Sequence, residues 1–328
     1  MSGPLAVVTG ASGFVGSHVV DELLRRGARV RCLLRPSSTL RWLEGKPVEL
    51  VFVSLEDAAA LRAAVAGAAW IVHAGGLISA RHASEFHAVN VGVTERMLRA
   101  ALSAGPGLRR FLYVSSLAAS GPSRDGMPVT EAHPPRPVSA YGESKLRGEE
   151  LVHQLRDRLP VCCVRPPAVY GPRDEVTLKI FRALRWHVRP EVRARGRFSM
   201  IYVEDLARAI ALALEDDGAV GEIFFASEPD VCDFERLGLQ LQEAMGTWAV
   251  PLRLPGWLLT TGALAGEAWG AITRTPPFLS RAKLQEIGAG DWLCSSAKIR
   301  SRLGWTPSVP MEEGLKRSVA WYREAGWV

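Results

Sequence analysis

Several features that define other classes of protein are missing from this sequence. Its 328 residues include five cysteines, an odd number with no Cys-x-x-Cys spacing, so we expect no metal site and no disulfide framework. No basic leader precedes a long apolar run, so we expect neither a secretory signal nor stable membrane insertion. Internal repeats and low-complexity tracts are also missing. These features fit a protein of the reducing cytoplasm.

The composition is that of an ordinary globular protein. Hydrophobic residues make up 48% of the chain and charged residues 23%, which argues against a disordered protein. The formal net charge is +6, but the basic residues form no tail or comb, so we expect no nucleic-acid partner. A chain of this length can bury one large α/β core or two smaller ones.

Short apolar segments alternate with helical patterns through the first half of the chain. This alternation predicts an α/β Rossmann fold, a doubly wound parallel sheet with helices on both faces. Ligands of such sheets bind at the carboxyl edge of the strands. The predicted strands are 5–9, 29–34, 48–55, 70–74, 111–115, 161–169, 198–203 and 222–226.

The chain changes character after Pro172. Its segments become irregular and include a basic stretch and a tryptophan-rich apolar stretch. We expect residues 1–172 to form the NAD(P)-binding Rossmann domain, with 198–232 returning to it. Residues 173–328 are then expected to form a smaller, interleaved substrate-binding domain.

A glycine-rich turn follows the first predicted strand directly. It reads Thr9-Gly10-Ala-Ser-Gly13-Phe-Val-Gly16 and opens a helix. Glycines permit a tight turn, close approach of the backbone to a pyrophosphate, and close packing of helix and strand. The helix N-terminus favours negative phosphates. A simple loop is the alternative, but the strand–turn–helix context favours dinucleotide binding. The residues expected to bind the cofactor here are Gly10, Ser12, Gly13, Phe14 and Val15.

No acidic residue stands at the end of the second predicted strand, where an NAD enzyme usually carries one for the ribose hydroxyls. Leu34 is followed instead by Arg35, Ser37 and Ser38. A cation and two hydroxyls suit the 2′-phosphate of NADP(H), unless Arg35 is only a solvent-exposed loop residue. The sequence therefore favours NADP(H) and leaves NAD(H) possible.

Tyr141 and Lys145 lie four residues apart in a predicted helix, so they share one helix face. A nearby ammonium stabilises a phenolate and brings the phenol pKa toward a working range. Ser115 and Ser116 end a central strand at the edge that also carries the glycine turn, where a hydroxyl can hold a substrate carbonyl. Each part alone also suits an ordinary surface pair or strand end. The combination favours proton transfer beside a bound nicotinamide.

These motifs together resemble the extended short-chain dehydrogenase/reductase superfamily over essentially the whole chain. The matches continue at Val72-His73-Ala74-Gly75, Asn90 with Thr94, Arg165-Pro166-Pro167-Ala-Val169-Tyr170-Gly171-Pro172, Tyr202-Val203-Glu204-Asp205-Leu206, and Leu303-Gly304-Trp305-Thr306-Pro307.

The resemblance implies roles for individual residues. Tyr141 would be the general acid/base, Lys145 would bind the nicotinamide ribose and tune the tyrosine, and Ser116 would position the substrate oxygen. Ser115 is the alternative to Ser116. A homodimer is implied as well, because helices around 94–104 and 141–159 form a two-subunit bundle in many relatives. Further cofactor contacts are implied at His73, Ala74, Pro166 and Val169.

The sequence departs from the family pattern at three places. Ser54-Leu55 stands where an aspartate is frequent beside the adenine, and Val93 replaces a glycine. Tyr202 stands where histidine is common. Asp57 matches a position that is mostly structural.

Within the superfamily the sequence most resembles the 3β-hydroxysteroid dehydrogenase and dihydroflavonol reductase branch. Arg35, the segment from Tyr113 to Pro122 and an apolar C-terminal stretch carry this resemblance. The apolar stretch would either cover a hydrophobic or aromatic substrate or pack the interior of the smaller domain. A shallow membrane contact is also compatible with it. Its residues are Trp257, Leu258, Leu259, Leu264 and Trp269.

A basic stretch favours a different substrate. Arginines over a cleft suit a diphosphate, as in a nucleotide sugar or a coenzyme A thioester, although such a run is often a solvated loop. Its residues are Arg182, Arg185, Arg189, Arg193, Arg195 and Arg197.

We therefore expect an NAD(P)(H)-dependent oxidoreductase that interconverts a ketone and a secondary alcohol on a hydrophobic or aromatic small molecule. Tyr141 would donate or accept the proton. The alternative enzyme is a nucleotide-sugar epimerase or dehydratase with tightly bound NAD. A non-catalytic dinucleotide sensor is the alternative from another class, but sensors of this kind usually lack the tyrosine or the lysine, and both are present.

Overall fold

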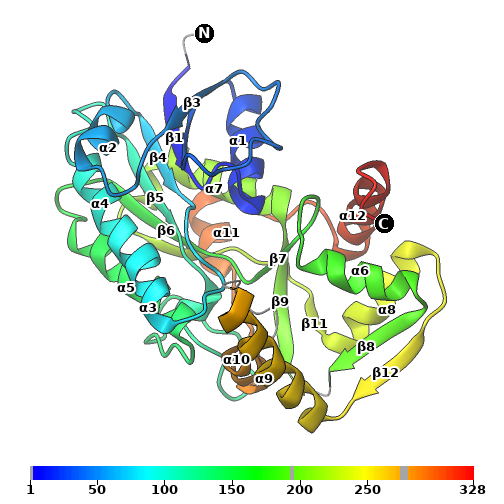
Figure 1. Ribbon diagram of the computed structural model, residues 1–328. Helices are drawn as coiled ribbons and strands as arrows, with labels where there is room; N and C mark the ends of the chain where they lie inside the picture. The colour runs from blue at the N-terminus through cyan, green and yellow to red at the C-terminus, as the bar shows by residue number, and fades with distance from the viewer. Residues whose placement is uncertain (1–2, 193–195, 274–279) are drawn as a thin grey trace.

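A parallel sheet of seven strands lies at the centre of the structure, a computed structural model that describes residues 3–192, 196–273 and 280–328 (Figure 1). Its strands are β1 (Leu5–Thr9), β2 (Arg29–Leu34), β3 (Val48–Phe52), β4 (Trp70–His73), β5 (Arg110–Val114), β6 (Val161–Arg165) and β10 (Ile223–Phe225). They are arranged in the order β10–β6–β5–β4–β1–β2–β3, and every neighbouring pair is parallel. Because the order reverses between β1 and β4, the carboxyl ends of these two strands are where a doubly wound sheet is expected to form its ligand crevice.

Helices cover both faces of this sheet, which is why its inner strands β1, β4, β5 and β6 are mostly buried on both sides. Val8 of β1 packs into the core on one face, and its neighbour Val7 packs into the core on the other. The predicted α/β Rossmann class is confirmed. The helices on the first face are α1 (Phe14–Arg25), α7 (Val203–Glu215) and α11 (Ala297–Leu303), and those on the second are α2 (Ala58–Val65), α4 (Gly92–Ala101) and α5 (Ala140–Gln154).

A smaller part of the molecule packs beside the carboxyl edge of the large sheet and has a core of its own. Its three-stranded sheet joins β7 (Ala168–Tyr170), β9 (Arg197–Tyr202) and β11 (Val231–Asp233), and its two-stranded sheet joins β8 (Val188–Val192) and β12 (Val250–Leu254). Its helices are α6 (Thr177–Arg185), α8 (Phe234–Met245), α9 (Gly256–Thr273), α10 (Arg281–Gly288) and α12 (Met311–Glu324). No helix of the described ranges is long and apolar enough to cross a membrane.

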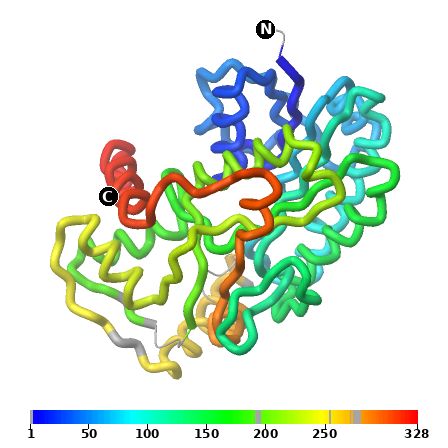
Figure 2. The backbone as a smooth tube through the Cα atoms, turned by 180° about the vertical axis from the view of Figure 1, so that it is seen from behind, coloured from blue at the N-terminus to red at the C-terminus, as the bar shows by residue number. Residues whose placement is uncertain are grey.

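The chain passes between the two parts several times. Helix α7 and strand β10 pack with the large sheet, whereas β9 and β11 lie in the three-stranded sheet. The segment between α10 and α12 crosses back along the rear of the molecule (Figure 2). Within 198–232, therefore, α7 and β10 lie with the cofactor half. The domain boundaries at 172 and 173 stay a prediction.

One predicted strand is wrong. The segment 161–169 forms two strands in different sheets, β6 and β7, instead of one continuous strand. Pro166 and Pro167 separate them, because proline has no amide hydrogen to donate and its ring restricts the backbone. This break carries the chain out of the large sheet at its carboxyl edge.

Candidate active site

The glycine turn lies at the carboxyl end of β1, where the strand order reverses. Gly10 has φ +70°, and a side chain there would come within 2.7 Å of the backbone nitrogen of Gly75, in the loop after β4. A side chain on Gly16 would collide with the carbonyl oxygen of Gly10. Glycine is needed at both positions because the backbone segments approach so closely.

The N-terminus of α1 fits the pyrophosphate of a dinucleotide. No side chain caps this helix end, and its first turn carries no acidic residue. The amide groups that begin the helix at Phe14 and Val15 are therefore available to an anion, with the helix dipole in its favour. Gly13 is exposed and Ser12 half-buried at the surface of the same turn.

Lys145 is directed at the carboxyl end of β5. Its side chain is only 5% exposed, and Nζ donates a 2.8 Å hydrogen bond to the carbonyl oxygen of Val114. Tyr141 lies one turn earlier in α5, next to Ser139, whose hydroxyl caps the helix by accepting from the Gly142 amide at 3.1 Å. The predicted common face of tyrosine and lysine thus points toward the crevice edge of the sheet.

Ser116 approaches Tyr141 and Lys145 from the end of strand β5. It follows β5 and begins a short 3₁₀ turn (Leu117–Ala119), where its hydroxyl accepts a 3.1 Å hydrogen bond from the Ala118 amide. The same hydroxyl lies close enough to the Tyr141 phenol to lower the pKa of that phenol. Ser115 is buried, and its hydroxyl has no hydrogen-bond partner among the described residues. The contact with Tyr141 favours Ser116 over Ser115 as the group beside the reacting oxygen.

Burial sets the protonation of both candidate catalytic groups. It raises the pKa of Tyr141 to about 12, and the nearby Ser116 hydroxyl works against this increase. It lowers the pKa of Lys145 to about 8, while the negative charge of Glu149 one turn further along α5 opposes the decrease. At neutral pH the phenol therefore holds its proton and the lysine is mostly charged. The expected lowering of the phenol pKa by Lys145 is wrong, because burial dominates and raises that pKa.

His73 belongs to a buried network beneath the crevice. Its Nδ1 lies 2.7 Å from the Thr9 hydroxyl and its Nε2 lies 3.0 Å from the Thr94 hydroxyl. Burial, together with the positive charge of Lys145, lowers the pKa of His73 to about 3, so the ring is neutral. Both ring nitrogens are occupied, so a cofactor contact at His73 must come from its backbone. Ala74, the next residue, is half-buried at the crevice.

Asn90 links the loop after β4 to α5 through hydrogen bonds. Its Oδ1 accepts from the Leu77 amide at 2.7 Å, and its Nδ2 donates to the Leu77 carbonyl at 3.0 Å and to the Ser144 hydroxyl at 2.9 Å. Asn90 lies in a π-helical turn (His87–Val91) between α3 (Ala83–Phe86) and α4. Such turns are frequent at functional sites. The sequence marked Asn90 only through the family resemblance, because a regular helical period does not reveal a π turn.

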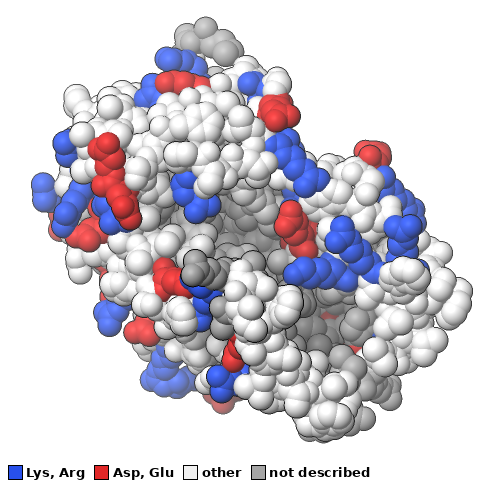
Figure 3. Space-filling model, viewed as in Figure 1, with Lys and Arg blue, Asp and Glu red and all other residues white. Residues whose placement is uncertain are grey.

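Two residues beside Tyr141 were not predicted from the sequence. The Phe86 ring lies 5.8 Å from the Tyr141 ring, and Glu286 of α10 is close enough to raise the pKa of the phenol electrostatically. Neither belongs to a motif. Helix α10 thus brings the smaller part of the molecule to the site, and the surface is hollowed between the two parts (Figure 3).

The remaining predicted cofactor residues lie along the same edge. Arg35 is exposed after β2, and its amide donates a 3.0 Å hydrogen bond to the Ser38 hydroxyl. Pro166 is buried after β6, where its carbonyl oxygen accepts from the Leu117 amide at 2.8 Å. Val169 is half-buried in β7. Their cofactor contacts stay predictions.

The basic stretch does not form one cluster of free cations. Arg189 is buried and paired with Glu191 at 2.9 Å, and Arg197 is paired with Asp291 at 2.6 Å. Of the other four, Arg182 and Arg185 are exposed on α6, and Arg193 and Arg195 lie outside the described residues.

The predicted apolar cover falls in α9 and faces outward. Four of its five residues are exposed, so the prediction that this stretch packs the interior of the smaller domain is wrong for them. The fifth, Leu259, is half-buried. The exposed members are Trp257, Leu258, Leu264 and Trp269.

The chain belongs to the NAD dependent epimerase/dehydratase family, whose model matches residues 6–226. It is 34% identical to a ceramide reductase of Caulobacter vibrioides, over 99% of this chain and 96% of the relative. It is 29% identical to a 4-hydroxy-2-methyl-3-oxo-4-farnesyl-3,4-dihydroquinoline-1-oxide ketoreductase of Stigmatella aurantiaca, over 94% and 93% of the two chains. A 3 beta-hydroxysteroid dehydrogenase/Delta 5→4-isomerase of Mycobacterium tuberculosis is 28% identical, over 96% and 90%.

Solved structures share the fold. The crystal structure of gox2253 has a TM-score of 0.81 and 28% identity, and the match covers 99% of both chains. A UDP-glucose 4-epimerase of Thermotoga maritima with UDP-glucose has a TM-score of 0.82 at 24% identity, covering 98% and 99%. The resemblance to the extended short-chain dehydrogenase/reductase superfamily is confirmed. The chain is an NAD-dependent enzyme of the dehydrogenase/reductase kind.

Proposed function

We propose that this protein is a ketoreductase that uses NADP(H) in preference to NAD(H) and interconverts a ketone and a secondary alcohol on a hydrophobic or aromatic substrate. The observation that carries the proposal is the meeting of Tyr141, Ser116 and Lys145 at the carboxyl edge of β5, beside the crevice between β1 and β4. A protonated phenol at that point is the proton donor that a carbonyl oxygen needs during reduction.

Each residue has a defined task in ketone reduction. Ser116 holds the substrate oxygen against Tyr141, and Tyr141 gives its proton to that oxygen. Lys145 would hold the nicotinamide ribose beside Tyr141, and solvent then returns a proton to the phenolate that remains. The reduced nicotinamide supplies the hydride to the carbonyl carbon when it is bound.

Each part of the cofactor has a proposed position along the crevice. Its pyrophosphate would lie on the turn from Gly10 to Val15, and Arg35 with Ser38 would hold the 2′-phosphate. The nicotinamide would lie near Lys145, with Ala74, Pro166 and Val169 around it.

Two observations favour a hydrophobic substrate over a nucleotide sugar. Arg189 and Arg197 are already paired with carboxylates, so they do not offer free charge to a diphosphate. Three of the relatives that match nearly the full chain are named for ceramide, a farnesylated quinoline oxide and a hydroxysteroid. These names describe large apolar molecules.

The test is cofactor consumption by the purified protein with long-chain acyl, steroid and aryl ketones beside nucleotide sugars. We expect oxidation of added NADPH with at least one hydrophobic ketone. Tyr141→Phe should lower kcat by roughly 10²- to 10⁴-fold, because it removes the proton donor. Tyr202→Phe, in the core of the smaller part, is the matched control. Conversion of a nucleotide sugar by protein that retains bound NAD, with no ketone reduced, would assign it to the epimerases instead.

A further inference from the structure

Helix α9 presents an apolar face to solvent, the reverse of an ordinary surface helix. Trp257, Trp269 and Ile272 are 68%, 66% and 76% exposed. At about 100° per residue, these three and the exposed Leu258 and Leu264 fall within an arc of about 140°. The buried positions, Ala263 and Gly270, lie on the opposite side of the helix.

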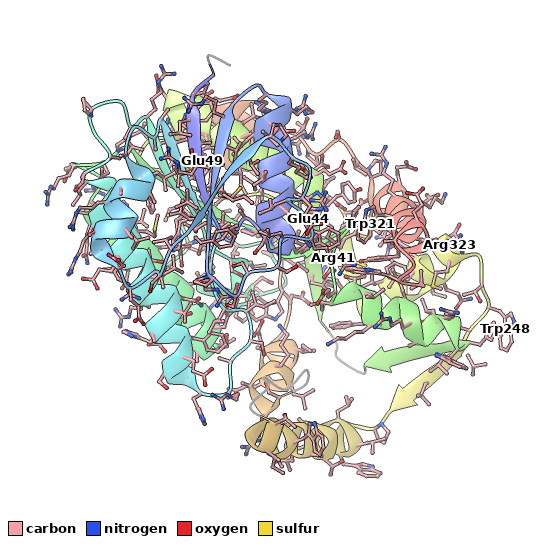
Figure 4. All side chains as sticks on the ribbon, turned by 45° about the horizontal axis from the view of Figure 1, so that its top comes forward. Arg41, Glu44, Glu49, Trp248, Trp321 and Arg323 are labelled. Carbon is pink, nitrogen blue, oxygen red and sulfur yellow. The ribbon has the colours of Figure 1, made fainter. Side chains whose placement is uncertain are left out.

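The apolar face continues onto the two-stranded sheet. Strand β12 ends one residue before α9 begins, and its residues Val250 and Leu252 are both exposed on one side of the strand. At its far end Trp248 is 63% exposed and stacks on the His187 ring at 4.0 Å, next to Trp186, which is 80% exposed. Figure 4 shows Trp248 projecting from this end of the molecule. We call α9, β12 and these two tryptophans the tryptophan surface.

The charges around the tryptophan surface have one dominant sign. Glu267 is the only acidic residue within α9 and β12, and Arg281 of α10 neutralises it at 2.9 Å. Arg182 and Arg185 are exposed in the last turn of α6, directly before Trp186. In Figure 3 basic side chains gather on the α6 side, beside a region free of charge.

We propose that the tryptophan surface docks on a lipid bilayer that contains anionic lipids. Tryptophan prefers the boundary between headgroups and acyl chains because its ring is apolar and its N–H can remain hydrated. An exposed apolar helix gains free energy by burying its side chains in this boundary, and arginines beside it attract anionic headgroups.

The position of the tryptophan surface also suggests how substrate enters. Helix α9 packs against α10, and α10 carries Glu286 beside Tyr141. A bilayer at α9 would therefore lie next to the substrate side of the active site, so a membrane-dissolved ketone could enter without crossing water. This part of the proposal rests on the proposed ketoreductase function; the docking does not.

Sedimentation with vesicles tests the docking. We expect the full-length protein to bind vesicles of phosphatidylcholine with phosphatidylglycerol, with a blue shift in tryptophan emission, and to bind pure phosphatidylcholine less. The double substitution Trp257→Ser with Trp269→Ser should weaken binding roughly tenfold or more. Arg182→Gln with Arg185→Gln should weaken binding to the anionic vesicles only. Phe52→Ser, which removes an exposed apolar side chain of β3, is the matched control.

Thermal unfolding of each variant separates lost docking from lost folding. The inactive Tyr141→Phe variant should bind vesicles like the unchanged protein, so failure of the ketoreductase assay and failure of docking remain distinguishable. Equal vesicle binding by the folded double tryptophan variant and the Phe52→Ser control would overturn the proposal. If the unchanged protein does not bind vesicles but forms a dimer, and the tryptophan substitutions dissociate that dimer, the surface contacts a second copy of the chain instead.

Discussion

At the scale of single residues, the buried charge of Lys145 lowers the stability of the folded protein. Its ammonium is buried 4.7 Å from the centre of the Tyr113 ring, with one hydrogen bond to the Val114 carbonyl. Burial lowers its pKa from 10.5 to about 8. Between these pH values the unfolded chain binds more protons, so stability rises with pH. Below about pH 8 the folded state carries the full cost, about 3 kcal/mol.

Lys145→Met should therefore stabilise the protein while abolishing activity. Loss of the buried charge outweighs the lost hydrogen bond, so we expect the free energy of unfolding at pH 7 to rise by about 2 kcal/mol. The increase in stability from pH 8 to pH 10 should become smaller. Urea unfolding from pH 7 to pH 10 measures both, with the exposed Lys283→Met as the control. A variant less stable than the unchanged protein at pH 7 would contradict this account.

Arg35 determines cofactor choice in the proposed function. Arg35→Glu should raise the KM for NADPH by roughly tenfold or more, because a charge-assisted contact to the 2′-phosphate becomes repulsive. The KM for NADH should not rise, and kcat should change little because Arg35 is at the end of β2. Initial rates with both cofactors test this, and Arg62→Glu, exposed on α2, is the control. Equal KM values for NADPH in the two variants would show that Arg35 does not bind the 2′-phosphate.

At the scale of elements, the segment between β2 and β3 is held by the C-terminal end of the chain. The Trp42 ring lies 5.5 Å from the Trp321 ring and 6.0 Å from the Trp327 ring. The Arg41 guanidinium lies 4.3 Å from the centre of the Trp42 ring and 4.5 Å from that of Trp327. Arg41 and Trp321 lie side by side in Figure 4 although they are distant in sequence. This aromatic cluster thus orders the segment that begins with Arg35.

Trp327→Ala should weaken cofactor binding without changing the chemical step. The segment after β2 loses ring and cation–π contacts, so we expect a lower Tm and a KM for NADPH that rises several-fold while kcat stays the same. Trp186→Ala, which removes an exposed tryptophan of the smaller part, is the control. A lower Tm with an unchanged KM would show that the cluster stabilises the protein without positioning Arg35.

At the scale of the whole molecule, two buried histidines make stability depend on acid. His18 ties α1 to the start of the smaller part through a 2.9 Å contact between Nε2 and the Pro172 carbonyl, and His73 joins β1, β4 and α4. Burial lowers the pKa of each from 6.5 to about 3. The unfolded chain binds more protons between these values, so stability is greatest above about pH 6.5 and falls as pH decreases.

His18→Gln should flatten this acid dependence. Each histidine contributes about 1.4 kcal/mol per pH unit below about pH 6, so the slope of unfolding free energy against pH should fall by that amount. Urea unfolding from pH 6.5 to pH 5, above the range where most carboxylates titrate, measures the slope. His133→Gln at an exposed position is the control, and equal slopes in the two variants would refute the assignment.

Sequence and structure contributed different parts of this description. The strand–turn–helix from Leu5 to Arg25 and the shared face of Tyr141 and Lys145 follow from the sequence, because glycine geometry and helical period act over a few residues. Sequence alone did not separate β6 from β7, although Pro166 and Pro167 mark the break. A proline pair signals an interruption, but only packing decides which sheet receives each strand.

The tertiary structure decided what surrounds those local elements. It buried His73 between two threonines, brought Glu286 and Phe86 to Tyr141, and turned the tryptophans of α9 outward. The helical period is the same whether an apolar face meets a core or solvent, so no sequence pattern distinguishes the two. The sequence by itself determined a dinucleotide fold with a tyrosine–lysine pair, and long-range packing determined the partners and surface of that site.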